Sequence, residues 1–188
     1  MTFNPDIHHR RSIRLKDYDY SQAGAYFVTI CTKDKECMFG VIEDAQMEFN
    51  DAGKMVQNVW HELPGRFPEI LLDEFIIMPN HLHGIVSIVG APLVGAQIPE
   101  VGARILEEDR AGTRPAPTLG DIISVFKSIT THLYTEGVMQ QRWQHFNGKL
   151  WQRNYYEHII RSEIELNKIR EYIINNVLNW EADENYKD

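Results

Sequence analysis

Cysteine and basic charge are both scarce in this chain of 188 residues. Its two cysteines, Cys31 and Cys37, form no CxxC pair, so reduced thiols are favoured over a disulfide or a zinc site. The formal net charge of -8 argues against a general, sequence-blind nucleic-acid binder. No apolar run is long enough to cross a bilayer, and the first residues lack the layout of a signal peptide. We therefore expect no membrane association and a cytoplasmic location.

Apolar residues are frequent enough to build a core. The chain is 43% hydrophobic and 11% aromatic, and its length is typical of one domain, which we expect to span residues 1–188. Within it, composition indicates a basic N-terminal arm at 1–24, a long mobile loop at 90–118 and an acidic tail at 181–188. The arm is interpreted either as a solvated segment or as one that contacts phosphate.

Hydrophobic periodicity predicts an alternation of strands and helices. Strands are expected at 25–32, 38–42, 70–78, 81–89 and 148–160, and helices at 51–63, 119–135 and 162–178. This order predicts an α+β fold: a ferredoxin-like split β-α-β antiparallel sheet, with helices on one face and an extra C-terminal helix. The other sheet face is then free to hold a site under the last helix.

Two histidines stand one residue apart at the start of the apolar strand 81–89. Side chains alternate across a strand, so His81 and His83 share one face while Leu82 points into a core. Two imidazoles on one face make a half-site for a divalent metal. For the pair alone, exposed histidines without a ligand remain the alternative.

Three polar side chains share a face of the predicted C-terminal helix. Tyr172 and Asn176 are four residues apart, and Lys168 lies four before Tyr172. A phenol, an amide and an ammonium therefore project together, and Lys168 is placed to steady a phenolate or a phosphate. On spacing alone, a half-buried tyrosine with the asparagine and lysine in solvent is the alternative.

Taken in order along the chain, these motifs resemble the single-tyrosine transposases of the IS200/IS605 type, and more closely the REP-associated tyrosine transposases. The resemblance covers most of the chain. The matching blocks are Arg10–Leu15, Tyr18–Tyr20, Tyr26–Thr32, Met78–Gly84, Phe126–Ser128, Leu150–His158 and Tyr172–Ile173. In one departure, Val177 follows Asn176 where the branch commonly has proline, which leaves the spacing from tyrosine to asparagine intact.

The resemblance implies a metal-dependent enzyme that cuts and rejoins single-stranded or hairpin DNA. Tyr172 is then the nucleophile that holds the 5′ end as a phosphotyrosine, and His81, His83 and Asn176 hold Mg²⁺ or Mn²⁺. The candidate nucleic-acid-binding residues are Arg10, Arg11, Arg14, Lys16, Lys127 and Arg153.

Several alternatives stay open. Tyr155 and Tyr156 are rival nucleophiles. The chain is also interpreted as a non-cleaving protein that binds DNA hairpins, or as a ferredoxin-like metallo-phosphodiesterase. Relatives of the insertion-sequence type work as dimers with shared sites, so the tyrosine serves either its own histidines or those of a second copy in a homodimer.

Overall fold

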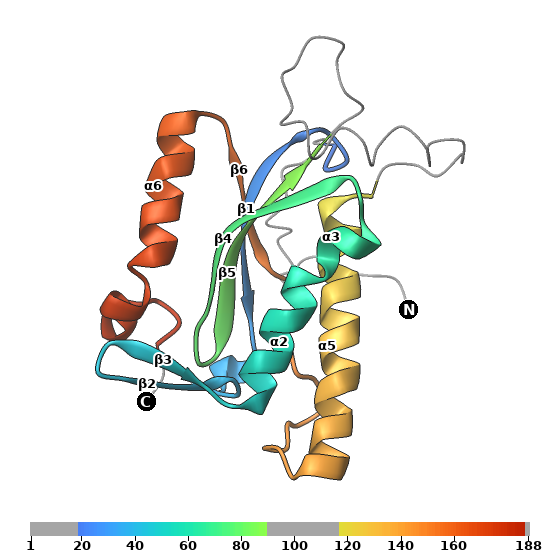
Figure 1. Cartoon of the computed structure of the whole chain (residues 1–188), viewed down its shortest axis with the longest axis vertical. Coiled ribbons are helices and arrows are strands. Elements are labelled where there is room, and N and C mark those ends of the chain that lie inside the picture. Colours follow the sequence, from blue (N-terminus) through green and yellow to red (C-terminus); the bar gives the residue numbers. More distant parts are fainter. Residues whose placement is uncertain (1–18, 90–116, 187–188) are drawn as a thin grey trace, which may run out of the picture.

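The computed structural model describes residues 19–89 and 117–186. These residues form a four-stranded antiparallel sheet in the order β4-β5-β1-β6, with helices on both sides (Figure 1). Its strands are β1 (Gly24–Cys31), β4 (Ile70–Ile77), β5 (His81–Ile88) and β6 (Tyr156–Ile160). The predicted α+β fold with an antiparallel sheet is confirmed, and the strand order is that of the split β-α-β plan.

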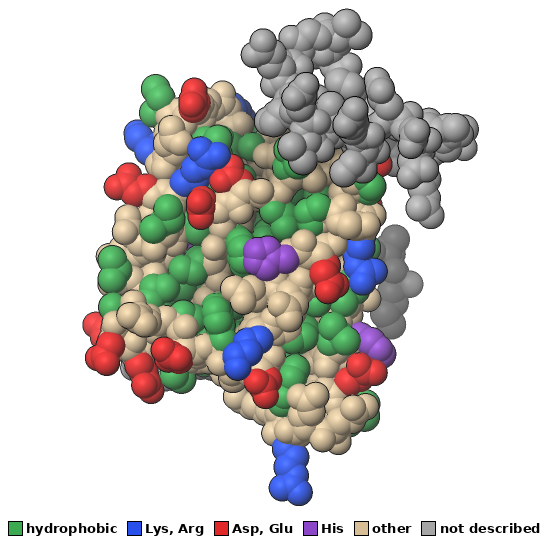
Figure 2. Space-filling model, viewed as in Figure 1, with side chains coloured by type: hydrophobic (Ala, Val, Ile, Leu, Met, Phe, Trp, Pro, Cys, Tyr) green, Lys and Arg blue, Asp and Glu red, His purple; other side chains and the backbone are tan. Residues whose placement is uncertain are grey.

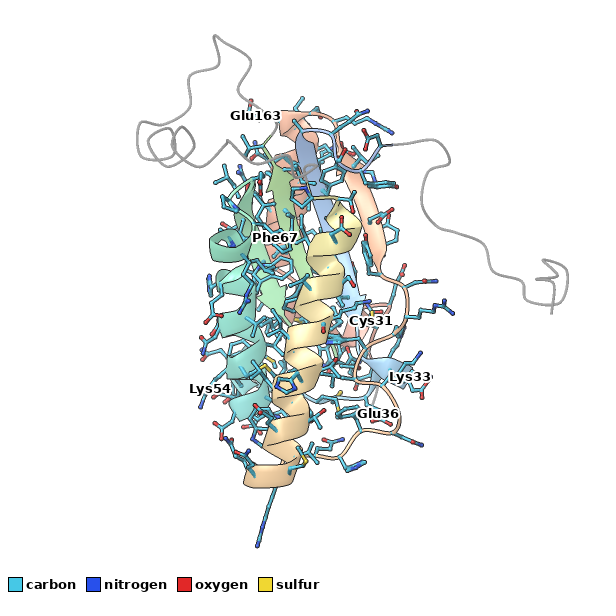
Figure 3. The ribbon with its side chains drawn as sticks, turned by 90° about the vertical axis from the view of Figure 1, so that its right-hand side faces the viewer. Cys31, Lys33, Glu36, Lys54, Phe67 and Glu163 are labelled. Atoms are coloured by element: carbon cyan, nitrogen blue, oxygen red, sulfur yellow. The ribbon has the colours of Figure 1, made fainter. Side chains whose placement is uncertain are left out.

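Helices α2 (Asp51–His61) and α5 (Leu119–Gln141) cover one face of the sheet. They lie side by side in front of the strands in Figure 3. Alternate residues of the strands point toward them, so one buried cluster includes Tyr26, Val28 and Leu82 together with Trp60 of α2 and Phe126 of α5. Burying these side chains supplies most of the stabilisation of the sheet.

Helix α6 (Glu163–Ile174) packs on the opposite face of the sheet, on the far side from α2 and α5 (Figure 1). The residues between those of the first cluster point this way, and Phe27 and Ile85 meet Ile173 of α6 in a second buried cluster. Because β1 and β5 alternate in this manner, the side chains at 81 and 83 must also face α6 rather than the main core.

Local signals explain where the helices begin. The side chain of Asn50 accepts a hydrogen bond from the backbone N–H of Gly53 at the start of α2. Thr118 and Asp121 form a reciprocal capping box at the start of α5, and Ser162 caps α6 by accepting from the N–H of Glu165. Each cap satisfies a backbone donor that has no partner inside the helix.

Two of the predicted elements have wrong boundaries at the C-terminal end. The strand expected at 148–160 begins only at Tyr156, and before it the backbone carbonyls of Gln152 and Asn154 accept hydrogen bonds from the ammonium of Lys127. The helix expected to reach residue 178 ends at Ile174, and the 3₁₀ segment η2 (Val177–Ala182) follows. The chain therefore turns back toward the sheet after α6 instead of continuing away from it.

Only one strand of the hairpin between β1 and α2 was predicted. The strand expected at 38–42 is β2 (Gly40–Glu43), and its partner β3 (Gln46–Phe49) was not predicted. The turn between them places Asp44 and Ala45 at positive φ, a conformation that alanine rarely signals in a sequence. The short helical segments η1 (Lys33–Lys35) and α3 (Leu63–Arg66) complete the described elements.

The predicted arm and loop fall largely outside the described residues. Arg10, Arg11, Arg14 and Lys16 are among those not described, as are residues 90–116 and 187–188. The end of the arm is described at Tyr20, which is buried and whose carbonyl accepts from the N–H of Leu119. No helix in the described ranges is long and apolar enough to span a membrane.

Candidate active site

The two histidines lie buried side by side under α6. His81 and His83 are 0% and 2% exposed, and their Nε2 atoms are 3.0 Å apart. Strand β5 is paired on both sides, by β4 and by β1, so the backbone that carries the imidazoles is held along both edges. This is the rigid mount that a reactive site needs.

Hydrogen bonds behind the rings orient the two imidazoles. Asn80 donates from Nδ2 to the carbonyls of Lys35 and Asn185, at 3.0 and 2.8 Å, which leaves its Oδ1 to accept from His81 Nδ1 at 2.8 Å. The proton of His81 is therefore on Nδ1, and the lone pair on Nε2 points into the site. His83 Nδ1 lies 2.8 Å from Thr29 Oγ1, directly across the β1–β5 ladder. Partners of this kind are the usual outer shell of metal-binding histidines.

Burial decides the charge of His81. It lowers the pKa of His81 to about 3, with a further lowering by the neighbouring His83. The imidazole is therefore neutral at physiological pH, the form in which a histidine binds a metal.

Tyr172 reaches this pair from the exposed side. Its hydroxyl lies 3.2 Å from His83 Nε2, and its ring meets the rings of Phe27 and His83 edge to face. Burial, followed by the nearby charge of Asp183, raises the pKa of Tyr172 to about 12. The phenol is thus protonated at neutral pH and needs a positive charge nearby to ionise.

Helix α6 is held in place by an ion pair with the sheet. Arg170 donates from Nε and from one terminal nitrogen to the two carboxylate oxygens of Asp73. Asp73 lies where the pairing of β4 with β5 shifts register, between Leu72 and Phe75, and such an irregularity re-aims side chains. Arg170 lies two residues before Tyr172, so this ion pair contributes to the orientation of the phenol.

Asp183 completes the cluster and was not predicted as a site residue. Its Oδ2 lies 4.0 Å from His81 Nε2 and 3.8 Å from His83 Nε2, and its side chain is 3% exposed. Burial would raise the pKa of Asp183, but the nearby imidazole of His83 and the hydrogen bond from the N–H of Asn185 outweigh it and hold the pKa well below its ordinary value. The sequence grouped this residue with a solvated acidic tail. One sequence feature speaks against that grouping: the large aromatic residue Trp180 stands three positions before Asp183. In the structure its ring lies 5.9 Å from that of His81.

Asn176 is brought to the site by the turn after α6, not by the helix itself. Its Nδ2 donates to Asp183 Oδ2 at 3.2 Å. Its Oδ1 is buried and has no hydrogen-bond partner in the described chain. An amide oxygen left without a partner beside two imidazoles and a carboxylate is a candidate metal ligand.

The donor set fits a divalent cation. One ligand atom from each of His81, His83 and Asp183 lies within 4.8 Å of the others. Mixed nitrogen and oxygen ligands suit Mn²⁺ and Zn²⁺ and, with fewer nitrogens, Mg²⁺. The residues present could therefore hold a cation of the predicted class.

Three other predicted residues, Lys168, Arg153 and Lys127, lie outside this cluster. Lys168 is exposed on α6, and no hydrogen bond or ion pair within the described ranges joins it to Tyr172. Arg153 is exposed. Lys127 is half-buried, and its ammonium donates to the carbonyls of Gln152 and Asn154 at 2.9 and 3.0 Å.

The rival tyrosines lie at the start of β6. Tyr156 is exposed and its ring contacts Phe27 edge to face. The ring of Tyr155 lies 5.5 Å from the ammonium of Lys127. Tyr172 is thus the tyrosine whose hydroxyl is hydrogen-bonded to the histidine pair within the described ranges.

Comparisons with known proteins give a relative that is similar over nearly the whole chain, and solved structures that are similar at low sequence identity. The chain is 44% identical over 189 residues to an uncharacterized protein of Haemophilus influenzae, covering 99% of this chain and 98% of that one. No family model matches. Among solved structures, a REP-associated tyrosine transposase bound to a REP hairpin is similar with a TM-score of 0.50 and 14% identity, over 88% of this chain and 73% of that one. A transposase-like protein of Deinococcus radiodurans has a TM-score of 0.46 and 15% identity, over 86% of this chain and 95% of that one. The similarity to the hairpin-bound structure shows that the chain has a transposase-like fold.

Proposed function

This chain belongs to one family with the uncharacterized H. influenzae protein, and we propose that it is a metal-dependent enzyme that nicks and rejoins single-stranded DNA through Tyr172. The proposed class is that of the REP-associated tyrosine transposases, with hairpin-flanked DNA as substrate. Lys168 is proposed to steady the phenolate or the scissile phosphate. The residues proposed to contact DNA, whose attraction to cations supplies much of the affinity, are Arg10, Arg11, Arg14, Lys16, Lys127 and Arg153.

One observation carries the proposal. The hydroxyl of Tyr172 lies 3.2 Å from His83 Nε2 although 89 residues separate the two in sequence. A tyrosine that merely packs on a sheet has no need to bring its hydroxyl to a buried histidine pair. A tyrosine nucleophile that acts on a phosphate beside a cation must do so.

The proposed cation ligands are His81, His83 and Asn176, to which the geometry adds Asp183. When bound there, Mg²⁺ or Mn²⁺ would withdraw electron density from the scissile phosphate and stabilise charge on the departing oxygen. Residues behind the imidazoles orient these ligands for a cation. Asn80 accepts from His81 Nδ1, so that His81 Nε2 faces the site, and Thr29 contacts His83 Nδ1.

The covalent step is a transesterification at phosphorus. The phenol oxygen of Tyr172 forms a bond to the phosphorus, the bond from phosphorus to the 3′ oxygen breaks, and a 5′-phosphotyrosine and a free 3′-OH result. The phenol gives up one proton to solvent and the departing 3′ oxygen takes up one, so the step is balanced. The phenol oxygen lies 3.5 Å from Asp183 Oδ2. Attack by a second 3′-OH reverses the step, so the phosphodiester is restored without ATP.

The test is covalent capture of DNA. The full chain is incubated with labelled single-stranded DNA that contains hairpins, in the presence of Mn²⁺, and denatured before electrophoresis. We expect a labelled protein band that Tyr172→Phe removes and that the matched variant Tyr156→Phe retains. His81→Ala is expected to remove the band while much of the DNA binding remains. Hairpin binding without any adduct would favour the non-cleaving alternative, and an adduct that survives Tyr172→Phe would contradict the proposed nucleophile.

A further inference from the structure

A cavity of about 540 Å³ opens beside the phenol of Tyr172. His83 and Tyr172 form the part of its wall that belongs to the candidate active site. Its opposite wall is made by Gln152, Asn154, Tyr155 and Tyr156, where the connection after α5 ends and β6 begins. The cavity thus extends from the proposed point of attack along the sheet toward β6, and its size is within the ordinary range of ligand pockets.

The wall combines aromatic rings with free amides. Phe27 and Tyr156 lie edge to face with ring centres 6.4 Å apart, and Tyr156 is 52% exposed, so its ring is available to a ligand. Gln152 and Asn154 also line the cavity. Neither side-chain amide makes a hydrogen bond within residues 19–89 and 117–186, and each carries both a donor and an acceptor.

The charges of the wall argue against a phosphate as occupant. None of the described residues that line the cavity is a lysine or an arginine, and Glu184 contributes a carboxylate. The carboxylate of Glu184 would repel a phosphate. An uncharged aromatic group with hydrogen-bonding edges would instead match both the aromatic rings and the amides of the wall.

Lys127 holds this wall in position from behind. Its ammonium donates to the backbone carbonyls of Gln152 and Asn154, and burial lowers the pKa of Lys127 to about 8. Gln152 also donates from its backbone N–H to the carbonyl of Cys31 at 2.9 Å, and Cys31 is labelled at the end of β1 in Figure 3. The two amide side chains are therefore mounted on a backbone that is tied at both ends.

We propose that this cavity receives an unpaired nucleobase of the DNA strand, next to the phosphate that Tyr172 attacks. The inference rests on the proposed function for the identity of the strand. Tyr156 stacks on the base, and Gln152 and Asn154 bond its edge, which makes these two residues determinants of base preference. Base stacking on an aromatic side chain tolerates every base, whereas amide contacts discriminate among them.

The experiment uses free deoxynucleosides, so that neither cleavage nor a known DNA sequence is needed. Saturation-transfer NMR is recorded on the full chain with each of the four deoxynucleosides and with deoxyribose 5-phosphate. We expect saturation of the base protons and none of deoxyribose 5-phosphate. Tyr156→Ala is expected to weaken all four nucleosides by about tenfold or more. Gln152→Ala is expected to change their order, and the matched variant Gln141→Ala to leave it unchanged.

Two results would overturn the inference. One is equal binding of deoxyribose 5-phosphate and the nucleosides, or binding of neither, since the cavity would then not select a base. The other is nucleoside binding that Tyr156→Ala and Gln152→Ala leave intact. Because DNA capture is measured separately, nucleoside binding without an adduct would retain the base pocket and reject the nuclease. An adduct without nucleoside binding would retain the nuclease and reject the base pocket.

Discussion

At the scale of single residues, the site depends on side chains whose partners are spread through the chain. His83 is held by Thr29 of β1, and His81 by the residue just before it, Asn80. Asp183 arrives from beyond the last helix and contacts both imidazoles. A carboxylate that is 3% exposed and close to two imidazoles is stabilised when a cation binds beside it.

The first prediction concerns Asp183 as a cation ligand. Asp183→Asn removes the charge but keeps the shape, so the affinity for Mn²⁺ measured by titration calorimetry should fall about tenfold or more. The matched variant Glu181→Gln, an exposed acid nearby in the chain, should leave it unchanged. Equal affinities of wild type and Asp183→Asn would exclude this carboxylate from the cation site.

At the scale of elements, the position of α6 on the sheet decides where the phenol lies. The helix buries Ile173 against Phe27 and Ile85, and Arg170 binds Asp73 of β4. Acidic side chains lie along the lower left of the face drawn in Figure 2, where the β2–β3 hairpin is placed, and basic ones are scattered among the acidic ones over the rest of that face. The apolar contact of Ile173 and the ion pair of Arg170 therefore hold α6 on the sheet.

The second prediction is that the contribution of the Arg170–Asp73 ion pair to stability depends on pH. The hydrogen bond from Arg170 holds the pKa of Asp73 below its ordinary value of 3.8. The pair therefore contributes stability above that value, and the contribution is lost as the pH falls through the lowered pKa. The melting temperature of Asp73→Asn should lie below that of wild type at pH 7, and the difference should shrink below about pH 4.

The matched variant Glu74→Gln changes the exposed neighbour and should show a smaller difference at pH 7. A difference between Asp73→Asn and wild type that stays constant down to pH 3 would show that charge is not what the pair contributes.

The third prediction concerns the contact between β5 and α2. Gly84 belongs to the histidine strand β5 and faces Trp60 of α2, and a Cβ at this position would come within 2.5 Å of the indole. Gly84→Ala should therefore lower the free energy of unfolding by about 1–3 kcal/mol, measured by urea denaturation. Gly65→Ala, with nothing within 4 Å of the added carbon, should cause no loss, because alanine favours the helix. A neutral Gly84→Ala would mean that Trp60 moves aside freely.

At the scale of the whole molecule, one chain contains every member of the cluster. Tyr172 reaches the His83 of its own chain at 3.2 Å, and Asp183 binds Asn176 within the same segment. Within this one chain the tyrosine thus meets its own histidines, whereas the sequence left open an exchange with a second copy, and mixing variants distinguishes the two arrangements.

The fourth prediction tests this arrangement by mixing two inactive variants. Tyr172→Phe lacks the nucleophile and His83→Ala lacks a ligand. If each chain uses its own residues, their mixture should form no more DNA adduct than either variant alone. Recovery of a substantial part of wild-type adduct formation would require sites shared between two copies, and a homodimer as the active form.

Much of the fold could be predicted because its signals are local. Alternation of apolar residues located β1 and β5, helical spacing located α2 and α5, and the order of elements indicated an antiparallel sheet. The errors came where long-range contacts replace local signals. Lys127 binds the carbonyls of Gln152 and Asn154 from a distant helix, and the turn after β2 has alanine at its second position of positive φ, where glycine is the usual signal.

For the site, the sequence determined which residues share a face: His81 with His83 through the period of a strand, and Tyr172 with Lys168 through that of a helix. It also determined the order of elements that the split β-α-β sheet requires. Only the tertiary structure decided that the chain turns back after α6 and brings Asp183 to the imidazoles. That meeting depends on a bend after Asn176 and on the packing of Trp180 beside His81. Periodicity describes residues within one element, and it carries no information on where the chain goes once that element ends.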